Sequence, residues 1–420
     1  MHWKETLPDW YIKEFGYQPS INIGTSGHVD HGKTTLIEAI TGVWTSAHSE
    51  ELRRGITIKV GYADAAFYKC AQCPPPICYS SQPTCTNCGG KSELSRVVSF
   101  VDSPGHESLM ANMLSGAALM DGAILVIAAN EKVPQPQTRE HLLALQVLGI
   151  HQIVIVQNKI DLTEYQAALE NYEQIKDFVR GSVADVAPIV PISAQHRLGI
   201  DALIEAIENN IKTPPRTRAK GAIMHVLRSF DINKPGIPIK HVKGGAIGGA
   251  LLQGEFNIGD EIEIRPGLLD EKKGKYEPIT SNIATLGTGA GLVERVRPGG
   301  LIAIGTKLDP TFVKSDSLIG SVVGHPNVLP NDIEEVTVEV HLFETAVGTQ
   351  DMIKVEPIRI REPLRLNIGT AAILGTVTNS RDGKIEIKLK KPVCMMPKDR
   401  VAISRRIADR WRLIGVGISA

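Results

Sequence analysis

Residues 20 to 212 alternate short apolar runs with stretches of helical periodicity. The apolar runs have the length and composition of buried strands: SINIG (20–24), RVVSFVD (96–102), GAILVIAAN (122–130), QIVIVQNK (152–159) and APIVPIS (187–193). Helical periods lie between them, as in TREHLLALQVLG (138–149) and YQAALENYEQIKDFVRGSV (165–183). This alternation predicts a doubly wound α/β domain, whose mostly parallel sheet is covered by helices on both faces. Ligands of such sheets bind beyond the carboxyl ends of the strands.

The pattern changes at NNIKTPPRTRAKG (209–221), where two prolines followed by basic residues predict a linker. Beyond it, glycines punctuate β-branched runs such as GGALLQGEFNIGDEIEIRPG (248–267), and a second, weaker break lies at GHPNVLPND (324–332). We therefore expect two β-barrel domains after the α/β domain. The expected boundaries are an amino-terminal extension at 1–20, the α/β domain at 21–212, and barrels at 213–327 and 328–420.

Composition narrows the class of protein without naming its activity. The 420 residues carry no net charge, so any nucleic-acid contact must come from a local basic surface. No apolar stretch approaches the ~20 residues of a membrane span, and the first residues lack the apolar core of a signal peptide. We expect a cytoplasmic protein. The aromatic residues of the extension favour docking onto the neighbouring domain over disorder.

The stretch GHVDHGKTT (27–35) directly follows the first apolar run. Its spacing Gly27-x4-Gly32-Lys33-Thr34 matches a phosphate-binding loop (P-loop), in which backbone amides surround phosphate oxygens. Lys33 is expected to reach the β- and γ-phosphates and Thr34 to ligate Mg²⁺. The expected nucleotide-binding residues of the loop are His31, Gly32, Lys33, Thr34 and Thr35. The plainer alternative is an ordinary strand-to-helix turn with an exposed lysine.

Three later strand ends favour the nucleotide hypothesis and select guanine. Asp102 in VDSPGHE (101–107) can hold a water of Mg²⁺, and the amide of Gly105 can approach the γ-phosphate. VQNKID (156–161) supplies the base-binding candidates, since a carboxylate can accept from two guanine N–H groups that adenine does not present. These candidates are Asn158, Lys159 and Asp161. PISAQ (191–195) adds Ser193, Ala194 and Gln195, whose backbone can meet the guanine O6.

Five of the six cysteines lie within residues 70–88. Cys70, Cys73, Cys85 and Cys88 form two CxxC pairs separated by eleven residues, which predicts a structural tetrahedral Zn²⁺ site in an insert at about 68–92. The alternative is free or oxidisable thiols, which a cytosolic location disfavours. We assign no role to Cys78 and expect the remaining cysteine, Cys394, to be a buried small hydrophobe.

These motifs resemble those of the translational GTPases, the superfamily of elongation factor Tu. The resemblance rests on GHVDHGKTTL, SEELRRGITI, DSPGHE and QPQTREHL. Other stretches are similar to the gamma subunits of archaeal and eukaryotic translation initiation factor two: HSEELRRGITIKVGYADA, the cysteine insert, RSFDINKPG and ISRRIADRWRLIGVG. This similarity covers nearly the whole chain after residue 20.

The resemblance implies roles for residues that spacing alone does not assign. Thr57 matches the switch-one threonine that binds Mg²⁺ in the GTP state, and Gly55 and Asp30 are expected near that metal. His106 matches the histidine that positions the attacking water. Val29 and Ile56 match the apolar gate that restrains it. The implied catalytic residues are Lys33, Thr57, Gly105 and His106.

The same resemblance implies a function and partners. It implies a GTPase switch that binds initiator methionyl-tRNA with GTP and delivers it to the small ribosomal subunit, releasing it after hydrolysis. It also implies a heterotrimer, with an alpha partner on the second domain and a beta partner on the GTPase domain. Alternatives are a selenocysteine-specific elongation factor, a GTPase subunit of a sulfate-activating enzyme, and a scaffold that binds nucleotide without turnover.

A locally basic segment lies near the carboxyl terminus, at residues 381–412. Arg405, Arg406, Arg410 and Arg412 surround Trp411 there. This segment is the best candidate for contact with RNA phosphates. The alternative is the solvated rim of a barrel, with Trp411 anchoring domain packing.

Overall fold

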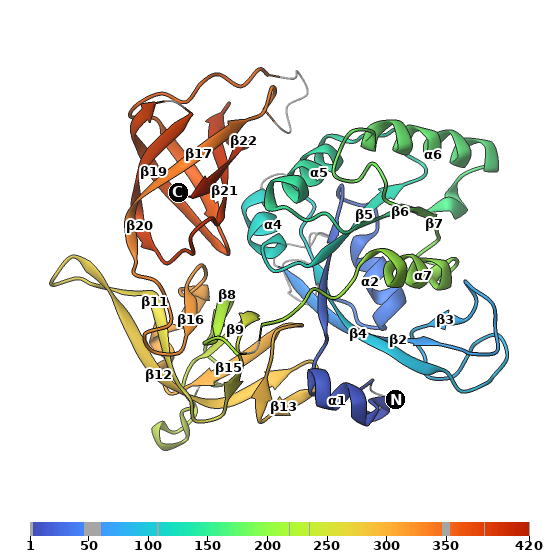
Figure 1. Ribbon diagram of the computed structural model, residues 1–420, viewed down its shortest axis with the longest axis horizontal. Coiled ribbons are helices and arrows are strands. Elements are labelled where there is room, and N and C mark those ends of the chain that lie inside the picture. Colours follow the sequence, from blue (N-terminus) through green and yellow to red (C-terminus); the bar gives the residue numbers. More distant parts are fainter. Residues whose placement is uncertain are drawn as a thin grey trace. The chain divides into compact units, whose positions relative to one another are not determined.

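The computed structural model describes residues 3–45, 60–106, 109–217, 219–234, 236–346, 353–381 and 383–419. The chain forms two compact units (Figure 1). The first contains residues 1–12, 19–214 and 345–353, and the second contains residues 13–18, 215–344 and 354–420. None of the helices in these described ranges is long and apolar enough to cross a membrane.

The first unit is built on a seven-stranded sheet in the order β3-β2-β4-β1-β5-β6-β7. Strands β4, β1, β5, β6 and β7 are parallel. At one edge β2 pairs antiparallel with β4, and β3 pairs antiparallel with β2. The strands are β1 (Ile21–Ser26), β2 (Gly61–Lys69), β3 (Tyr79–Ser80), β4 (Glu93–Asp102), β5 (Gly122–Ala128), β6 (Ile153–Asn158) and β7 (Ile189–Pro191). The mostly parallel α/β fold predicted from the alternating pattern is confirmed.

Helices cover both faces of this sheet (Figure 1). They are α2 (Lys33–Thr41), α4 (Met110–Ala117), α5 (Pro136–Leu148), α6 (Tyr165–Val179) and α7 (Ile200–Asn210). The apolar faces of α2 and α7 join the buried side chains of β1, β5 and β6 in one core. Strand β5 is buried at every position, as expected for a central strand covered on both sides.

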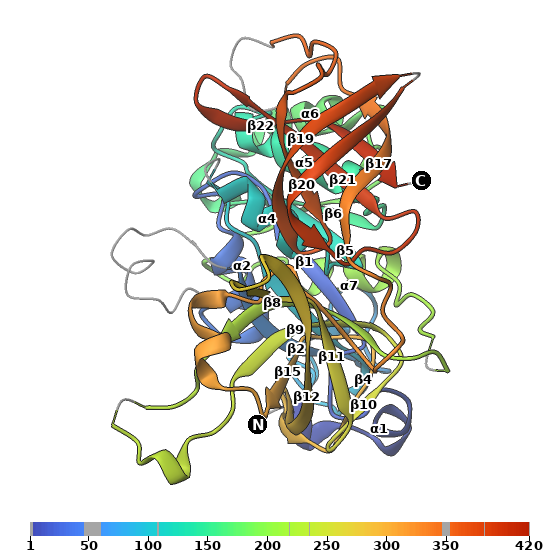
Figure 2. The ribbon, with the colours of Figure 1, turned by 90° about the vertical axis from the view of Figure 1, so that its left-hand side faces the viewer.

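The second unit contains two closed antiparallel barrels, as predicted. The first is the ring β11-β16-β8-β9-β15-β12, which the β11–β12 pairing closes. Its strands are β8 (Ile223–Phe230), β9 (Ala246–Gln253), β11 (Glu261–Asp270), β12 (Lys275–Thr288), β15 (Ile302–Thr306) and β16 (Val322–Gly324). Short strands β10 (Phe256–Asn257), β13 (Gly291–Val293) and β14 (Arg295–Val296) accompany it. A turn of 3-10 helix, η4 (Ile239–His241), lies in the segment between β8 and β9, which stands out from the barrel wall in Figure 2.

The second barrel is the ring β17-β20-β19-β18-β21-β22. Its strands are β17 (Ile333–Leu342), β18 (Pro363–Ile368), β19 (Ala371–Arg381), β20 (Lys384–Val393), β21 (Arg400–Ile407) and β22 (Arg410–Ser419). Side chains of β19 alternate between buried and exposed along most of the strand. This period of two is the pattern expected of a strand with one face in a barrel interior. The domain boundaries at 212 and 327 stay predictions.

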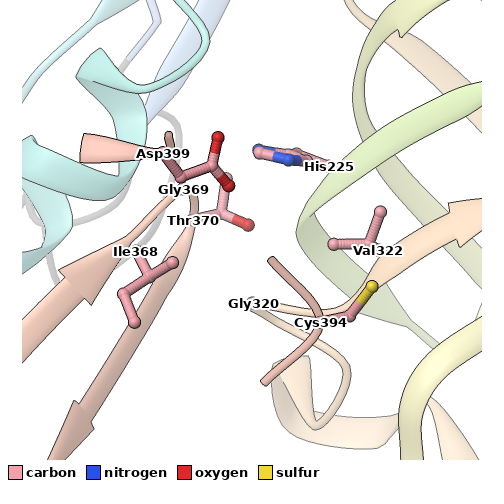
Figure 3. A pocket seen from close by; sticks show the side chains of 8 residues that line it. All are labelled: His225, Gly320, Val322, Ile368, Gly369, Thr370, Cys394 and Asp399. Atoms are coloured by element: carbon pink, nitrogen blue, oxygen red, sulfur yellow. The ribbon is translucent and has the colours of Figure 1, made fainter. Parts of the chain in front are cut away.

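A small cavity lies where the two barrels meet within the second unit (Figure 3). The His225 ring, the Thr370 hydroxyl and the Asp399 carboxylate point toward it. Its volume is about 10 Å³, which is room for about a single water molecule. Gly369 (φ +53°) lies close to the ring, since a Cβ there would come 2.6 Å from His225 Cε1. The barrels thus pack closely, and the cavity is far too small for a nucleotide.

The amino-terminal extension is ordered against its neighbours. In the first unit it forms η1 (Trp3–Thr6) and the start of α1 (Asp9–Phe15), and Tyr11 is fully buried beside Ser20 and Val97. In the second unit the Gln18 side chain donates to the Gly299 carbonyl at 2.7 Å and accepts from the Arg297 amide at 2.9 Å. The docking expected from its aromatic residues is therefore observed for Tyr11.

Candidate nucleotide and metal sites

The P-loop connects the carboxyl end of β1 to the start of α2, as predicted. Its turn depends on positive φ angles at Gly27 (+136°), Asp30 (+62°) and Gly32 (+88°). A Cβ on Gly27 would lie 2.2 Å from the Val126 carbonyl oxygen, and one on Gly32 would lie 2.4 Å from Asn158 Nδ2. Both glycines are therefore required by the backbone and by close neighbours.

Lys33 folds back over the loop. Its ammonium donates to the carbonyl oxygens of Gly27 at 2.9 Å and His28 at 2.6 Å. Burial lowers the pKa of Lys33 to about 8, while Asp102 and Asp30 act in the opposite direction. The turn with an exposed lysine, the plainer alternative, is wrong, because this lysine is buried. Its charge lies inside the loop, where an anionic ligand would compensate its desolvation.

Asp102 is fully buried at the end of β4 and collects three hydroxyl groups. Its Oδ2 accepts from Thr34 at 2.7 Å and Thr45 at 2.6 Å, and its Oδ1 accepts from Thr25 at 3.1 Å. Burial raises the pKa of this carboxyl, although the hydroxyl bonds oppose the shift. A carboxylate beside a threonine hydroxyl is a donor set that fits Mg²⁺. Thr25 and Thr45 were not predicted from the sequence.

Gly105 lies against the P-loop. A Cβ at this glycine would come 2.5 Å from Lys33 Nζ and 3.1 Å from the Val29 amide nitrogen. His106 follows it and is partly exposed, and its carbonyl accepts from the Leu109 amide at 2.9 Å. The structure thus brings Gly105 to the loop. The predicted residues Gly55, Ile56 and Thr57 lie outside the described residues.

The other predicted loop residues differ in exposure. Asp30 is exposed and Thr35 is partly buried. The His31 side chain turns into the protein, where Nδ1 lies 3.1 Å from the Val126 carbonyl oxygen and Nε2 lies 3.3 Å from Glu131 Oε2. Burial lowers the pKa of His31 to about 4. Any contribution of His31 to nucleotide binding therefore has to come from its backbone.

Asn158 connects the P-loop with the two predicted base-binding segments. Its Nδ2 donates to the His31 carbonyl at 2.9 Å, and its Oδ1 accepts from the Ala194 amide at 3.0 Å. Ser193 Oγ accepts from the His196 amide at 3.3 Å, which tightens the second segment. No local motif predicts these bonds, yet they gather residues 31, 158 and 193–194 at one edge of the sheet.

The remaining base-binding candidates lie at the surface of that edge. Lys159 adopts a positive φ of +63°, and Asp161 and Gln195 are exposed. The Asp161 carboxylate lies 3.6 Å from His196 Nε2, within ion-pair range if that histidine is protonated. The Asp161 side chain itself is 21% exposed, so its carboxylate is partly accessible to the N–H edge of a base.

The four predicted zinc ligands converge in the insert between β2 and β4. The sulfur atoms of Cys70, Cys73, Cys85 and Cys88 all lie within 4.8 Å of one another. Cys70 and Cys88 are 3.6 Å apart, and Cys73 and Cys85 are 3.7 Å apart. Tetrahedral Zn–S bonds of ~2.3 Å place sulfurs roughly 3.8 Å apart, so the cluster fits Zn²⁺. We call residues 70–88 the cysteine knuckle.

The two other cysteines are structural. Cys78 lies within the knuckle and is buried in the core, and its carbonyl accepts from the Cys70 amide at 2.8 Å. Cys394 is buried in the second unit, with Sγ 3.5 Å from the Pro330 carbonyl oxygen. Burial raises the pKa of the Cys394 thiol to about 12. The expectation of a buried small side chain at Cys394 is confirmed.

The basic carboxy-terminal segment is only partly available to a partner. Arg405 pairs with Glu362 and donates to the Glu356 carbonyl at 2.8 Å, and Arg412 is buried. The Arg365 guanidinium lies over the Trp411 ring at 5.4 Å. Trp411 and Arg405 therefore have internal roles. The predicted RNA contact of this segment stays a prediction.

Comparisons with known proteins agree with this geometry. Residues 18–213 match the family model described as the elongation factor Tu GTP binding domain. Residues 334–419 match the model described as initiation factor eIF2 gamma, C terminal. Translation initiation factor 2 subunit gamma of Archaeoglobus fulgidus is 56% identical over 400 residues, which is 95% of this chain and 94% of that protein. The Pyrococcus horikoshii subunit is 57% identical over 403 residues, covering 96% and 97%.

Solved structures share the fold at lower identity. A bacterial selenocysteine-specific elongation factor superposes with a TM-score of 0.71 at 22% identity, over 95% of this chain but only 58% of that longer one. Elongation factor SelB of Methanococcus maripaludis, in complex with a GTP analogue, gives 0.70 at 20% identity over 95% and 78%. The family is set by the much closer relatives. The chain belongs to the gamma subunits of translation initiation factor 2, a family of translational GTPases with an elongation factor Tu-type GTP-binding domain.

Proposed function

We propose that this chain binds initiator methionyl-tRNA when GTP is bound, delivers it to the small ribosomal subunit and releases it after GTP hydrolysis. The main support is the similarity to gamma subunits, which runs through all three predicted domains. A GTP-dependent switch of this kind couples the γ-phosphate to the order of nearby segments. Loss of the γ-phosphate then lowers the affinity for tRNA.

Within the proposed site, each side chain has a distinct role. Lys33 would bind the β- and γ-phosphates, and Thr34 together with Asp102, the latter through water, would hold Mg²⁺. The amide of Gly105 would contact the γ-phosphate, and His106 would orient the attacking water. Asp30, Gly55 and Thr57 complete the proposed metal environment. The magnesium ion would supply charge neutralisation for the transferred phosphoryl group.

Guanine would be selected at the other end of the nucleotide. The Asp161 side chain is partly exposed, and its carboxylate can accept two hydrogen bonds from the base. The backbone of Ser193, Ala194 and Gln195 would meet the guanine O6. Asn158 supports this arrangement, because it holds Ala194 and His31 at 3.0 and 2.9 Å.

We propose that the alpha partner docks on the first barrel. Phe230 at the end of β8, and Ile232 and Val242 in the segment between β8 and β9 of that barrel, are exposed. Figure 2 shows this segment standing out from the barrel wall. Exposed apolar side chains that lie near one another are typical of protein–protein contacts. An alpha partner that covers them would bury their apolar surface.

We place the beta partner on the GTP-binding domain. Leu162 is exposed shortly before α6, Tyr165 is exposed at its first residue, and Leu169 is exposed one turn later. Residues 165 and 169 lie four positions apart and therefore share one helix face. An apolar helix of the partner would fit such a face.

Filter binding of labelled tRNA tests this function. The chain, alone and then with alpha and beta subunits, is mixed with GDP or a non-hydrolysable GTP analogue. Uncharged initiator tRNA and elongator tRNAs serve as competitors. We expect methionyl initiator tRNA to bind preferentially with the analogue, and Asp102→Asn to abolish the preference. Asp185→Asn, which changes an exposed aspartate of the same unit, serves as the control.

Two results separate this function from its alternatives. Preference for selenocysteinyl-tRNA would favour an elongation factor, whose fold this chain shares. Absence of tRNA binding in every nucleotide state, with both subunits present, would sink the proposal. A metabolic GTPase subunit or a nucleotide-binding scaffold would then be the better explanation.

A further inference from the structure

Helix α5 places two side chains against the P-loop, although neither follows from the P-loop pattern itself. His141 Nδ1 lies 3.0 Å from the Gly27 amide nitrogen and 3.0 Å from the Ser26 hydroxyl. Gln137 Oε1 accepts from the Val29 amide at 3.2 Å. The two residues are four positions apart, so they project from the same face of the helix. Together they hold both ends of the segment 26–29.

The direction of these bonds fixes the chemical state of His141. A backbone amide can only donate, so Nδ1 has to carry a free lone pair, and the ring proton of the neutral imidazole is on Nε2. His141 is buried, and burial holds the pKa of its imidazole well below the usual value, with Lys33 acting in the same direction. The ring is therefore a hydrogen-bond acceptor at physiological pH.

The bonds matter because the loop backbone is held in a demanding conformation. Gly27 has a φ of +136° and packs against the Val126 carbonyl oxygen. Its amide and the Ser26 hydroxyl are buried, so losing their acceptor would leave two donors without a partner. The Val29 amide belongs to a partly exposed residue, where water can replace a lost acceptor.

We propose that His141 and Gln137 are positioning residues that set how long the P-loop retains GTP and GDP. They act through the loop backbone and need not touch the nucleotide. His141 makes the larger contribution, because it serves two buried donors, and Gln137 makes the smaller one. The inference rests on the proposed placement of the phosphates in this loop.

Release of fluorescent mant-GDP and mant-GTP, followed by stopped flow on the full chain, tests the inference. His141→Leu removes the acceptor and should speed release roughly 10-fold, and Gln137→Met should speed it about 3-fold. His141→Asn places an oxygen near the position of Nδ1 and should restore most of the slow release. His141→Gln moves the acceptor one bond further and should not. Arg139→Ala, an exposed position on α5, should leave release unchanged.

The outcomes separate this inference from the nucleotide site itself. Failure of the unmodified chain to bind mant-GDP would overturn the proposed placement of the phosphates. Unchanged release from His141→Leu, with normal binding by the unmodified chain, would overturn only the inference. Equal release from His141→Asn and His141→Leu would reduce His141 to a packing role and overturn it as well. If His141→Leu does not fold, the comparison of Asn with Gln at 141 and the Gln137→Met result decide.

Discussion

The P-loop and the cysteine knuckle are both ligand-gathering turns of the first unit, but different things hold them in shape. The P-loop is held by protein groups: Lys33, His141, Gln137 and Asn158 all bond to its backbone. The knuckle gathers four sulfurs within 4.8 Å of one another. Among the described residues, these thiols have only weak partners, such as the Gln72 amide 3.4 Å from Cys70 Sγ.

The difference shows two ways in which a sequence prepares a site. A loop that its neighbours hold in place keeps its conformation when the ligand dissociates. This suits a nucleotide that is bound and released repeatedly. A cluster of thiols is completed by its ion, so we expect metal binding and folding of the knuckle to be coupled. Removing a ligand residue should therefore unfold the knuckle, whereas removing one neighbour should only loosen the P-loop.

The largest effect is expected from breaking the knuckle. Cys85→Ser removes one of four thiolates, so zinc content should fall from about one ion per chain to near zero, because structural sites use all four ligands. Amides of residues 68–92 should then exchange with solvent faster by several orders of magnitude. Mass spectrometry of the native chain and hydrogen exchange measure both. Cys394→Ser, a buried cysteine outside the cluster, is the control and should keep its zinc. A Cys85→Ser chain that retains zinc would contradict the assignment.

The second largest effect is expected when a single methyl group is added to the P-loop at Gly27. Gly27→Ala would put a Cβ 2.2 Å from the Val126 carbonyl oxygen, at a φ of +136° that alanine rarely adopts. We expect GDP affinity to fall at least ~100-fold, which is about 3 kcal/mol. Titration calorimetry measures it. Gly42→Ala is the matched control, since its φ is +75° but the space around it is open. That variant should lose only about 1 kcal/mol of stability and no affinity. Normal GDP binding by Gly27→Ala would show that the loop is not preformed.

Acid should weaken the support of the P-loop through His31. Burial lowers the pKa of His31 from 6.5 to about 4, so the unfolded chain takes up the proton first. The contribution is complete above pH 6.5. The loss of stability grows as pH falls toward 4 and is about 2 kcal/mol at pH 5. Urea unfolding of the GTP-binding domain at several values between about pH 4 and 7.5, a range that includes both pKa values, measures this loss of stability. The slope should be shallower in His31→Gln, which cannot titrate. Identical slopes would remove His31 from this role.

The smallest effect is expected where a single side chain joins two segments. Asn158→Ala removes the bonds to the His31 carbonyl and the Ala194 amide, both of which are in buried residues. Affinity for GDP should fall roughly 10-fold, because two weak bonds are lost but the loop keeps its other supports. Asn210→Ala, which removes only a bond within α7, is the control. A loss as large as that of Gly27→Ala would mean that Asn158 holds the whole loop.

The sequence predicted the parts of the molecule that depend on local pattern. The alternation of strand and helix gave the α/β domain, the glycine-rich β runs gave two barrels, and the CxxC spacing gave the sulfur cluster. These features are written in consecutive residues, so periodicity and spacing reveal them. The turn of the P-loop was also predictable from local sequence, because its glycines stand at positions whose positive φ angles other residues rarely adopt.

The sequence did not predict contacts made by residues distant along the chain. Thr45 and Thr25 reach the Asp102 carboxylate from opposite ends of the P-loop region, and His141 reaches Gly27 across 114 positions. Nothing in the local pattern of a threonine or a helical histidine tells which carboxylate or amide it will meet. The stretch QPQTREHL is recognisable as a motif in the sequence. The contacts of its Gln137 and His141 with the P-loop are apparent only once α5 is seen to pack beside β1.

The order of strands has a consequence for the behaviour of the protein in solution. One edge strand of the sheet in the first unit is β7, which has three residues and ends at Pro191. The other edge strand is β3, which has two residues and lies within the cysteine knuckle. Short outer strands offer few free amides for another chain to pair with. Loss of zinc would release β3 from its pairing with β2 and expose the end of β2. The exposed edges of two molecules could then pair with each other. A zinc ion bound by the knuckle would then also protect the protein against aggregation.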